Sequence, residues 1–230
     1  MAGRHAEDTV GRQVWRKLVA GVRLALIVLL AALALLGLAE TPLVAGLLGR
    51  APEEPPLVGL VAGHWQNDSG AVCADGLQEV EINLEIARRT AYLLRQKGYR
   101  VEVLPEYSPK LEGYRAAVFL AIHCDSCVAN LSGFKVARLT NAAVPEDEDE
   151  LVRLLSAAYA QATGLVFHAE TITEDMRQYH ALRRIAPETP GAIIELGFMG
   201  GDRRLLTQEQ WRVARGLAEG LLAFLQRPSR

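Results

Sequence analysis

Two histidines and two glutamates stand where buried strands end or where a helix begins, and together they could carry out hydrolytic chemistry. His64 follows the apolar run LVGLVA, His123 follows the apolar run AAVFLAI, and Glu195 lies within the run GAIIEL. In open α/β sheets, reacting groups gather at the carboxyl ends of the strands. Glu79 begins a long helical stretch after the His64 loop, where the helix N-terminus stabilises a carboxylate and the returning loop can aim it at His64.

These residue types fit a catalytic zinc site. Two imidazoles and one carboxylate, from His64, His123 and Glu79, are a Zn²⁺ ligand set that leaves a fourth position for water. Glu195 would then accept the proton of that water. The spacing alone is weak support, because the chain has no H-E-x-x-H motif and a histidine after a strand is usually a hydrogen-bonded loop residue. Glu195 is more informative, since a carboxylate in a buried strand is costly unless it is paired or bound to a metal.

The elements that would position these residues indicate an α/β fold. Apolar or alternating runs predict strands at residues 57–62, 99–104, 116–122, 134–140 and 191–196. Helical spacing of apolar residues predicts helices at residues 77–97, 151–163 and 208–225. Several strands are apolar throughout, which is typical of a sheet covered on both faces. We therefore predict a single-domain mixed, mostly parallel sheet flanked by helices on both faces.

The acidic run PEDEDE lies just before the second predicted helix. We predict a solvated loop that leads into the helix N-terminus, where carboxylates suit the helix dipole. A calcium-binding or partner-binding role for this run is the alternative.

The N-terminal region predicts a transmembrane helix. Residues 24–39 are apolar and uncharged, and extension back to Leu18, with Arg23 reaching the interface, gives a length that spans a membrane. Basic residues precede this run, so the positive-inside rule keeps the N-terminus cytoplasmic and exports the rest of the chain. The small residues Gly37 and Ala39 would suit signal cleavage and secretion. The long basic leader favours a retained anchor in the cell membrane, which we prefer.

The predicted organisation has four segments. Residues 1–17 are a cytoplasmic basic leader, 18–39 a transmembrane anchor or signal sequence, 40–56 a Pro- and Glu-rich linker, and 57–230 the catalytic domain. The length of 230 residues is too short for two such domains and a linker. A formal net charge of −2 argues against a nucleic-acid partner held by phosphate contacts. No pattern in the sequence indicates the oligomeric state.

Four stretches of sequence, in this order, resemble a known enzyme family. They are GHWQNDSGA, GLQEVEINL, AIHCDS and TPGAIIELGFMG, which begin at Gly63, Gly76, Ala121 and Thr189. Together they resemble the zinc-dependent N-acetylmuramoyl-L-alanine amidases, a cell-wall family, over residues 57 to about 225. The family fold, a mixed sheet flanked by helices, agrees with the fold predicted from the residues alone.

The resemblance implies a role for each of the four candidate residues. His64, Glu79 and His123 correspond to the zinc ligands, and Glu195 corresponds to the catalytic glutamate. The implied reaction hydrolyses the amide bond between N-acetylmuramic acid and L-alanine in peptidoglycan, so peptidoglycan is the expected partner. Three alternatives stay open: an inactive amidase-like module that regulates or binds the wall, a zinc amidohydrolase or peptidase for another exported amide, and a structural membrane-tethered protein.

Residues near the candidate ligands have expected supporting roles. Asp68 and Asn83 match family positions and would brace or orient the site. Trp65 either lines a sugar or peptide cleft or packs in the core. Glu81 is a near neighbour that could be mistaken for the ligand Glu79.

The chain also departs from the family pattern. Trp65 and Gln66 replace the two residues that usually follow the first histidine, and Cys124 and Asp125 stand where alanine and asparagine are usual. The stretch between residues 104 and 116 is shorter than usual and lacks an arginine-to-asparagine segment. These departures bear on substrate preference and leave the ligand set intact.

The cysteines and the remaining histidines complete the candidates. Cys73, Cys124 and Cys127 lie close in sequence to the predicted ligands. In an exported domain we expect a disulfide between two of them, and we favour Cys73 paired with Cys124 or Cys127 over the C-x-x-C pair. A thiolate metal ligand is the alternative. His168 and His180 match no motif and are predicted to be surface or groove residues.

Overall fold

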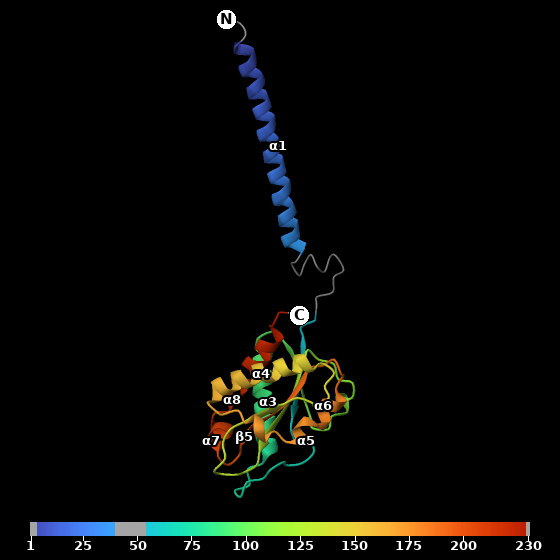
Figure 1. Cartoon of the computed structure of the whole chain (residues 1–230), viewed down its shortest axis with the longest axis vertical. Coiled ribbons are helices and arrows are strands. Elements are labelled where there is room, and N and C mark those ends of the chain that lie inside the picture. Colours follow the sequence, from blue (N-terminus) through green and yellow to red (C-terminus); the bar gives the residue numbers. More distant parts are fainter. Residues whose placement is uncertain (1–3, 40–53, 229–230) are drawn as a thin grey trace. The chain divides into compact units, whose positions relative to one another are not determined.

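The computed structural model describes residues 4–39 and 54–228, and the chain divides into two units, Met1–Glu54 and Pro55–Arg230. The first unit contains the continuous helix α1 (Arg4–Ala39) (Figure 1). Within α1, Lys17–Ala34 is long and apolar enough to cross a membrane, and none of it is buried. By length and composition this helix suits either a membrane anchor or a signal sequence. Most of the predicted linker, residues 40–53, lies outside the described residues.

The second unit is built on one five-stranded sheet with the strand order β2-β1-β3-β5-β4. Its strands are β1 (Leu57–Ala62), β2 (Arg100–Leu104), β3 (Val118–Asp125), β4 (Lys135–Ala137) and β5 (Gly191–Phe198). The first three pairings, β1 with β2, β1 with β3 and β3 with β5, are parallel, and β4 is antiparallel to β5. The central strands β1, β3 and β5 are apolar because both of their faces are buried. This confirms the predicted mixed, mostly parallel sheet.

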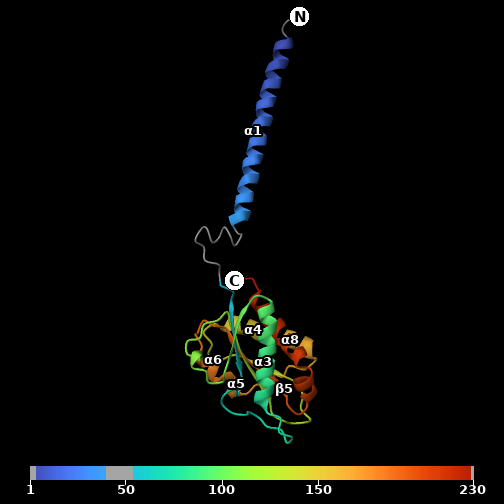
Figure 2. The same cartoon turned by 180° about the vertical axis from the view of Figure 1, so that it is seen from behind.

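Helices cover both faces of the sheet (Figures 1 and 2). On one face, a hydrophobic core joins the sheet to α3 (Glu79–Gln96), α4 (Pro145–Thr163) and α8 (Gln210–Leu225). The opposite face packs against the short helices η1 (Pro109–Leu111), α5 (Glu174–Arg177) and α6 (His180–Arg184). Two more short helices, η2 (Ala169–Thr171) and α7 (Arg203–Gln208), complete this unit.

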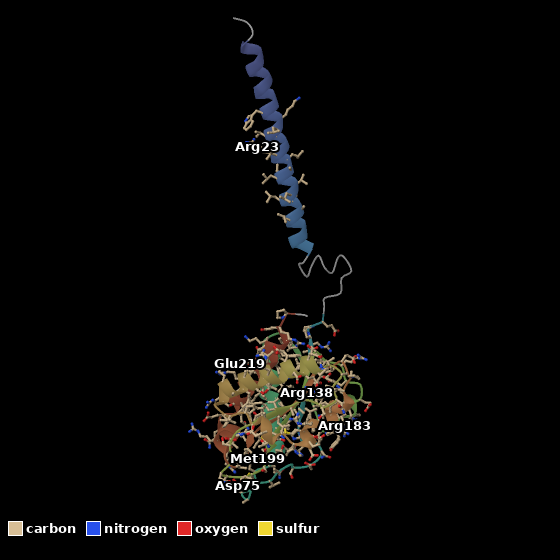
Figure 3. All side chains as sticks on the ribbon, in the orientation of Figure 1. Arg23, Asp75, Arg138, Arg183, Met199 and Glu219 are labelled. Carbon is tan, nitrogen blue, oxygen red and sulfur yellow. A yellow bond between two sulfur atoms is a disulfide. The ribbon has the colours of Figure 1, made fainter. Side chains whose placement is uncertain are left out.

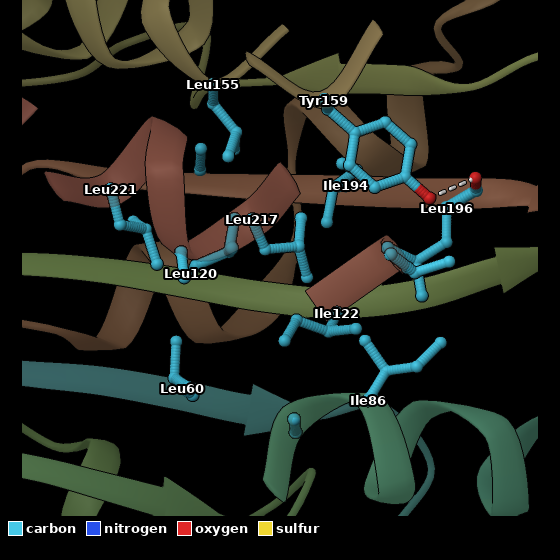
Figure 4. Packing of buried hydrophobic residues seen from close by; sticks show 14 of the residues in the cluster. Leu60, Ile86, Leu120, Ile122, Leu155, Tyr159, Ile194, Leu196, Leu217 and Leu221 are labelled. Atoms are coloured by element: carbon cyan, nitrogen blue, oxygen red, sulfur yellow. Dashed lines mark hydrogen bonds between the residues drawn. The ribbon is translucent and has the colours of Figure 1, made fainter. Parts of the chain in front are cut away.

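The larger core depends on close packing between α4 and α8. A Cβ atom on Gly216 would lie 2.9 Å from the Cβ of Ala162, and one on Gly220 would lie 2.7 Å from the Cα of Leu155. These two glycines, four residues apart on α8, therefore let the helices approach closely. Tyr159 of α4 is fully buried between them and the sheet, and its hydroxyl donates a 2.7 Å hydrogen bond to the Leu196 carbonyl (Figure 4). This bond satisfies the only polar atom that the tyrosine side chain brings into the core.

The acidic run shows where a local prediction is wrong. Residues 145–150 are the first turns of α4 and not a solvated loop, because Pro145 fits the first helical position and carboxylates suit a helix N-terminus. Glu148 is turned inward, is only 5% exposed, and accepts a 3.1 Å hydrogen bond from the Gly191 N–H at the start of β5. Its second oxygen is buried and finds no hydrogen-bond partner among the described residues. Burial raises the pKa of Glu148 to about 7.

We expect Glu148→Gln to reduce the pH dependence of stability. Between the ordinary pKa of 4.5 and the folded value of about 7, the folded protein keeps a proton that the unfolded chain releases, so stability falls as pH rises. Glutamine keeps an acceptor for Gly191 without a buried charge. Above pH 7 the free energy of unfolding of the variant should exceed that of the wild type by on the order of 2 kcal/mol. At pH 5 the variant should lose this advantage. Urea unfolding followed by tryptophan fluorescence at both pH values measures the difference.

The matched control is Glu146→Gln, which removes an exposed carboxylate from the first turn of the same helix. It should leave the pH dependence of the free energy of unfolding as it is in the wild type. Equal pH dependence in Glu148→Gln and the wild type would show that the buried carboxyl does not titrate as described.

Candidate metal-binding and catalytic site

Three of the predicted site residues meet at the carboxyl end of the sheet. His64 follows β1, His123 lies near the end of β3, and Glu79 is the first residue of α3. Their ligand atoms all lie within 4.8 Å of one another, and among the described residues they form the one such group of three or more. Glu79 Oε2 lies 3.3 Å from His64 Nε2, and Glu79 Oε1 lies 3.2 Å from His123 Nδ1. One carboxylate thus faces both rings.

The same end of the domain carries the loops before α3 and after β5. Asp75 and Met199, which belong to these two loops, both lie at this end in Figure 3. Asp75 also pairs with Arg203 of α7, so the loop before α3 is tied to the region that follows β5. The site residues therefore come from segments that are far apart in sequence and lie at one edge of the fold.

The loop after β1 presents His64 in an uncommon backbone conformation. His64 has a φ of 66° and Gln66 a φ of 61°, in the left-handed region that costs a non-glycine residue roughly 1–2 kcal/mol. The N–H of Gly63 donates a 2.9 Å hydrogen bond to the Ile122 carbonyl and so fixes the turn against β3. A Cβ atom on Gly63 would lie 2.4 Å from the His123 ring. Glycine is needed here because the turn passes directly beside that ring.

Glu79 is buried and held by hydrogen bonds on both oxygens. Oε1 accepts from Asn83 Nδ2 at 3.0 Å and from the Cys124 N–H at 3.1 Å, and Oε2 accepts from the Ala71 N–H at 3.0 Å. Burial acts to raise the pKa of Glu79, but its hydrogen bonds to His123 and the other site histidine hold that pKa well below the ordinary value. The carboxylate therefore stays ionised, as a ligand of a divalent cation must.

Asp68 orients the ring of His64. Its Oδ1 lies 2.5 Å from His64 Nδ1 and also accepts a 2.8 Å hydrogen bond from the Gly70 N–H. This contact leaves His64 Nε2 directed at Glu79. Hydrogen bonding to Glu79, opposed by burial, raises the pKa of His64 to about 9. A carboxylate behind a ligand histidine is the usual way to fix its tautomer.

Glu195 lies beside this group on β5. It is the register partner of His123 across the parallel β3–β5 pair. Its Oε2 is buried and has no hydrogen-bond partner among residues 4–39 and 54–228, and burial raises the pKa of Glu195 to about 7. A carboxyl group with a pKa near neutrality can both accept and return a proton.

The donor set fits a zinc ion. Two imidazole nitrogens and one ionised carboxylate oxygen are the three protein ligands of a known class of catalytic zinc site. Each candidate ligand also has a hydrogen-bonded partner behind it, such as Asp68 for His64 and Asn83 for Glu79. Glu195 Oε2 adds a buried polar atom that has no hydrogen-bond partner in the described part of the chain.

The cysteines and the other candidates lie around this group. Cys73 and Cys127 form a disulfide with a Cα–Cα distance of 5.4 Å, and Cys124 is a buried free thiol. The disulfide ties the segment before Glu79 to the segment after β3. No cysteine belongs to the group of candidate ligands among the described residues. Trp65 is partly buried and packs against the larger hydrophobic core.

His168 and His180 also lie outside the group of candidate ligands. His168 contacts Glu170 and the Ser132 carbonyl, at 3.2 Å and 3.1 Å. The Nε2 atom of His180 lies 2.6 Å from a carboxylate oxygen of Glu106.

Glu106 and Tyr179 are site residues that the sequence did not reveal. Glu106 Oε2 accepts a 2.7 Å hydrogen bond from the His64 N–H and lies 3.5 Å from His123 Nε2. The Tyr179 hydroxyl lies 3.0 Å from the same His123 nitrogen. Glu106 comes two residues after β2, so its place at the carboxyl edge of the sheet was an available signal. Tyr179 lies between α5 and α6, and no periodicity or motif marks it.

Comparisons with known proteins match the second unit of the chain. A family model described as N-acetylmuramoyl-L-alanine amidase matches residues 58–223. The catalytic domain of CwlV, an N-acetylmuramoyl-L-alanine amidase from Bacillus (Paenibacillus) polymyxa var. colistinus, is 26% identical, with a TM-score of 0.56 over 74% of this chain and 98% of that one. No curated protein sequence matches the chain.

Two further solved structures share the fold at lower identity. The N-acetylmuramoyl-L-alanine amidase AmiC2 of Nostoc punctiforme is 24% identical, with a TM-score of 0.59 over 75% of this chain and 98% of that one. The N-acetylmuramyl-L-alanine amidase Ami1 from Mycobacterium smegmatis is 17% identical, with a TM-score of 0.61 over 76% of this chain and 99% of that one. The fold is therefore common to proteins whose sequences differ widely.

We expect zinc binding to release protons and to strengthen as pH rises. With a pKa of about 9, His64 holds a proton at pH 7 that a metal ion must displace. Affinity should therefore rise with pH until about pH 9 and fall as the solution becomes more acidic. Isothermal titration calorimetry at pH 7, in two buffers with different ionisation enthalpies, should show at least one proton released per ion.

His64→Ala should lose zinc, whereas the control His168→Ala, outside the candidate ligand group, should bind it as the wild type does. Zinc binding by the wild type without proton release would contradict the protonation state assigned to His64.

Proposed function

The chain belongs to the N-acetylmuramoyl-L-alanine amidase family, and we propose that it is a zinc-dependent enzyme that cleaves the bond between N-acetylmuramic acid and L-alanine in peptidoglycan stem peptides. Membership of this family places the chain in the class of cell-wall amidases. The observation that carries the finer proposal is the convergence of His64, Glu79 and His123 beside the unpartnered carboxyl oxygen of Glu195.

His64 Nε2, His123 Nδ1 and a Glu79 oxygen are the atoms that would hold the metal. When bound there, zinc would supply a Lewis acid that polarises the scissile carbonyl and makes water a stronger nucleophile. The protein contributes the orientation of these three ligands. Asp68 holds the Nδ1 side of His64, and Asn83 holds one oxygen of Glu79.

Glu195 is the proposed general base and acid. Its Oε2 atom would accept a proton from the attacking water and then donate that proton to the nitrogen of the leaving L-alanine. Both steps need a carboxyl group that is neither strongly acidic nor permanently protonated, and burial places the pKa of Glu195 at about 7. The missing hydrogen-bond partner leaves this oxygen available for the proton.

We propose that residues 18–39 anchor the enzyme in the cell membrane, with residues 57–230 outside the cytoplasm. Lys17–Ala34 is long and apolar enough to span a membrane, and basic residues precede its apolar part. The Cys73–Cys127 disulfide supports an oxidising compartment for the catalytic domain. A signal sequence that is cleaved to secrete the enzyme is the alternative, and mass spectrometry of the mature N-terminus distinguishes the two.

We expect Glu195→Gln to retain zinc and to lose turnover by about 10²–10⁴-fold, because the variant keeps the shape of the side chain but cannot accept the water proton. Zinc content is measured by elemental analysis of the purified protein. Turnover is measured by digestion of peptidoglycan and mass spectrometry of the released stem peptides, whose new N-terminus must be L-alanine.

The matched control is Glu81→Gln, an exposed carboxylate on the same helix as Glu79. It should keep both zinc and turnover, whereas Glu79→Gln should lose zinc. Wild-type turnover in Glu195→Gln would remove the assigned role of that residue. Peptidoglycan cleavage by a fully zinc-free wild type would remove the metal from the proposal.

A further inference from the structure

A buried hydrogen-bonded cluster lies behind His123 and takes no part in the steps above. We call Glu106, Tyr179 and His180 the Glu106 network. Glu106 is 4% exposed and Tyr179 is 9% exposed. His180 stacks on the exposed ring of Tyr107, with ring centroids 4.3 Å apart. The network thus runs from the surface to the back of a candidate zinc ligand.

We propose that Glu106 is a positioning residue that acts through Tyr179 to hold His123 with its proton on Nε2 and its Nδ1 lone pair facing the metal site. This inference rests on the proposed function, because it concerns how the same site binds zinc.

The contacts of Glu106 fix the direction of its hydrogen bonds. Its Oε1 atom lies 2.6 Å from the Tyr179 hydroxyl and 2.6 Å from His180 Nε2. Its Oε2 atom lies 2.7 Å from the His64 backbone nitrogen. A carboxylate only accepts hydrogen bonds, so all three partners donate to it.

The hydroxyl of Tyr179 transmits this direction to His123. It has a single proton, and that proton is donated to Glu106. Towards His123 Nε2, which is 3.0 Å away, the hydroxyl oxygen can therefore only accept. Nε2 must carry a proton, and in the neutral ring this leaves Nδ1 as the unprotonated nitrogen. Without metal, Nδ1 donates its own proton to Glu79 Oε1, 3.2 Å away, and this is the proton that a metal ion would displace.

The two candidate ligand rings are thus fixed in opposite ways. Asp68 contacts Nδ1 of His64 and leaves Nε2 for the metal, whereas the Glu106 network holds Nε2 of His123 and leaves Nδ1. Glu106 also accepts from the backbone N–H of His64, in the left-handed turn. One buried carboxylate therefore supports both histidines, although neither resemblance nor periodicity marks it.

Glu106→Gln tests this idea because the two side chains have the same shape but different hydrogen-bond directions. If the new amide nitrogen faces Tyr179, the hydroxyl must accept from it and turn its own proton towards His123 Nε2. The ring proton then moves to Nδ1 and occupies the metal position. If the amide nitrogen faces the other way, it meets the His64 N–H, and two donors oppose each other. Both arrangements weaken the zinc site.

The experiment measures zinc affinity of the full chain by competition with a chromophoric chelator, without substrate. We expect Glu106→Gln to lose zinc affinity by about 10–100-fold, as is typical for the partners of ligand histidines. Glu102→Gln is the matched control, because Glu102 on β2 also accepts from a tyrosine, Tyr114, and from Lys110. It removes the same charge and the same type of contact away from the site, so zinc affinity should be unchanged.

A second measurement separates orientation from a general effect on folding. In protein with ¹⁵N-labelled histidine, free of metal and at a pH where the ring is neutral, long-range ¹H–¹⁵N spectra report which nitrogen of His123 carries the proton. We expect a protonated Nε2 in the wild type and in Glu102→Gln, and an unprotonated Nε2 in Glu106→Gln. A purely structural role for Glu106 would lower stability without moving this proton.

Tyr179→Phe keeps the Glu106 carboxylate and removes only the tyrosine hydroxyl, so it is the variant to measure if Glu106→Gln fails to fold. His123 Nε2 would then have only Glu106 Oε2, 3.5 Å away, and zinc affinity should fall by a smaller factor. Wild-type affinity together with a protonated Nε2 in whichever variant folds would overturn the inference. Failure of the proposed function is seen separately, as absence of zinc binding or of peptidoglycan cleavage by the wild type.

Discussion

The whole site depends on one buried carboxylate that contacts two imidazole rings. Glu79 is 4% exposed, and its oxygens lie 3.3 Å from His64 and 3.2 Å from His123. A buried carboxylate is strongly unfavourable without partners, so the fold must bring the rings and three N–H donors to it. Without metal the rings are held as protonated partners of the carboxylate, and a divalent cation would take the place of those protons. Either form gives the buried charge a partner.

This requirement explains the uncommon features of the neighbouring backbone. The left-handed turn at His64 and the glycine before it let a loop pass against β3 with no side chain between them. The Cys73–Cys127 disulfide fixes the segments that flank Glu79 and His123 relative to each other. The site is therefore built from strained or cross-linked connections on a parallel sheet. The register of β1, β3 and β5 sets the positions of the strand ends that carry the site residues.

The fold and the meeting of His64, Glu79 and His123 at one edge of the sheet could be predicted because they depend on local patterns and a general rule of sheets. Apolar strands are visible in the sequence, and their carboxyl ends meet at one edge. Which cysteine pairs with Cys73 was harder to predict: β3 continues beyond the predicted end at residue 122, so Cys124 lies within the strand as a buried free thiol, and Cys127, which follows the strand, forms the disulfide. The burial of Glu148 was not predicted because a charge pattern does not show which carboxylate of a helix is turned inward. Tyr179 lies in a short irregular connection whose path depends only on tertiary packing.

The two sides of the site differ in their access to solvent, and this difference bears on how each ligand is held. The side chains of His64 and Asp68 are 25% and 55% exposed, whereas those of His123 and Glu106 are 9% and 6% exposed. Water can replace a lost hydrogen bond at the exposed pair, but it has little access to the buried pair, where an unmatched donor or acceptor keeps most of its desolvation cost. The direction of hydrogen bonding therefore matters more behind His123 than behind His64. A rigid ring on the closed side and an accessible ring on the open side are a consistent arrangement for an enzyme whose polymeric substrate must approach from solvent.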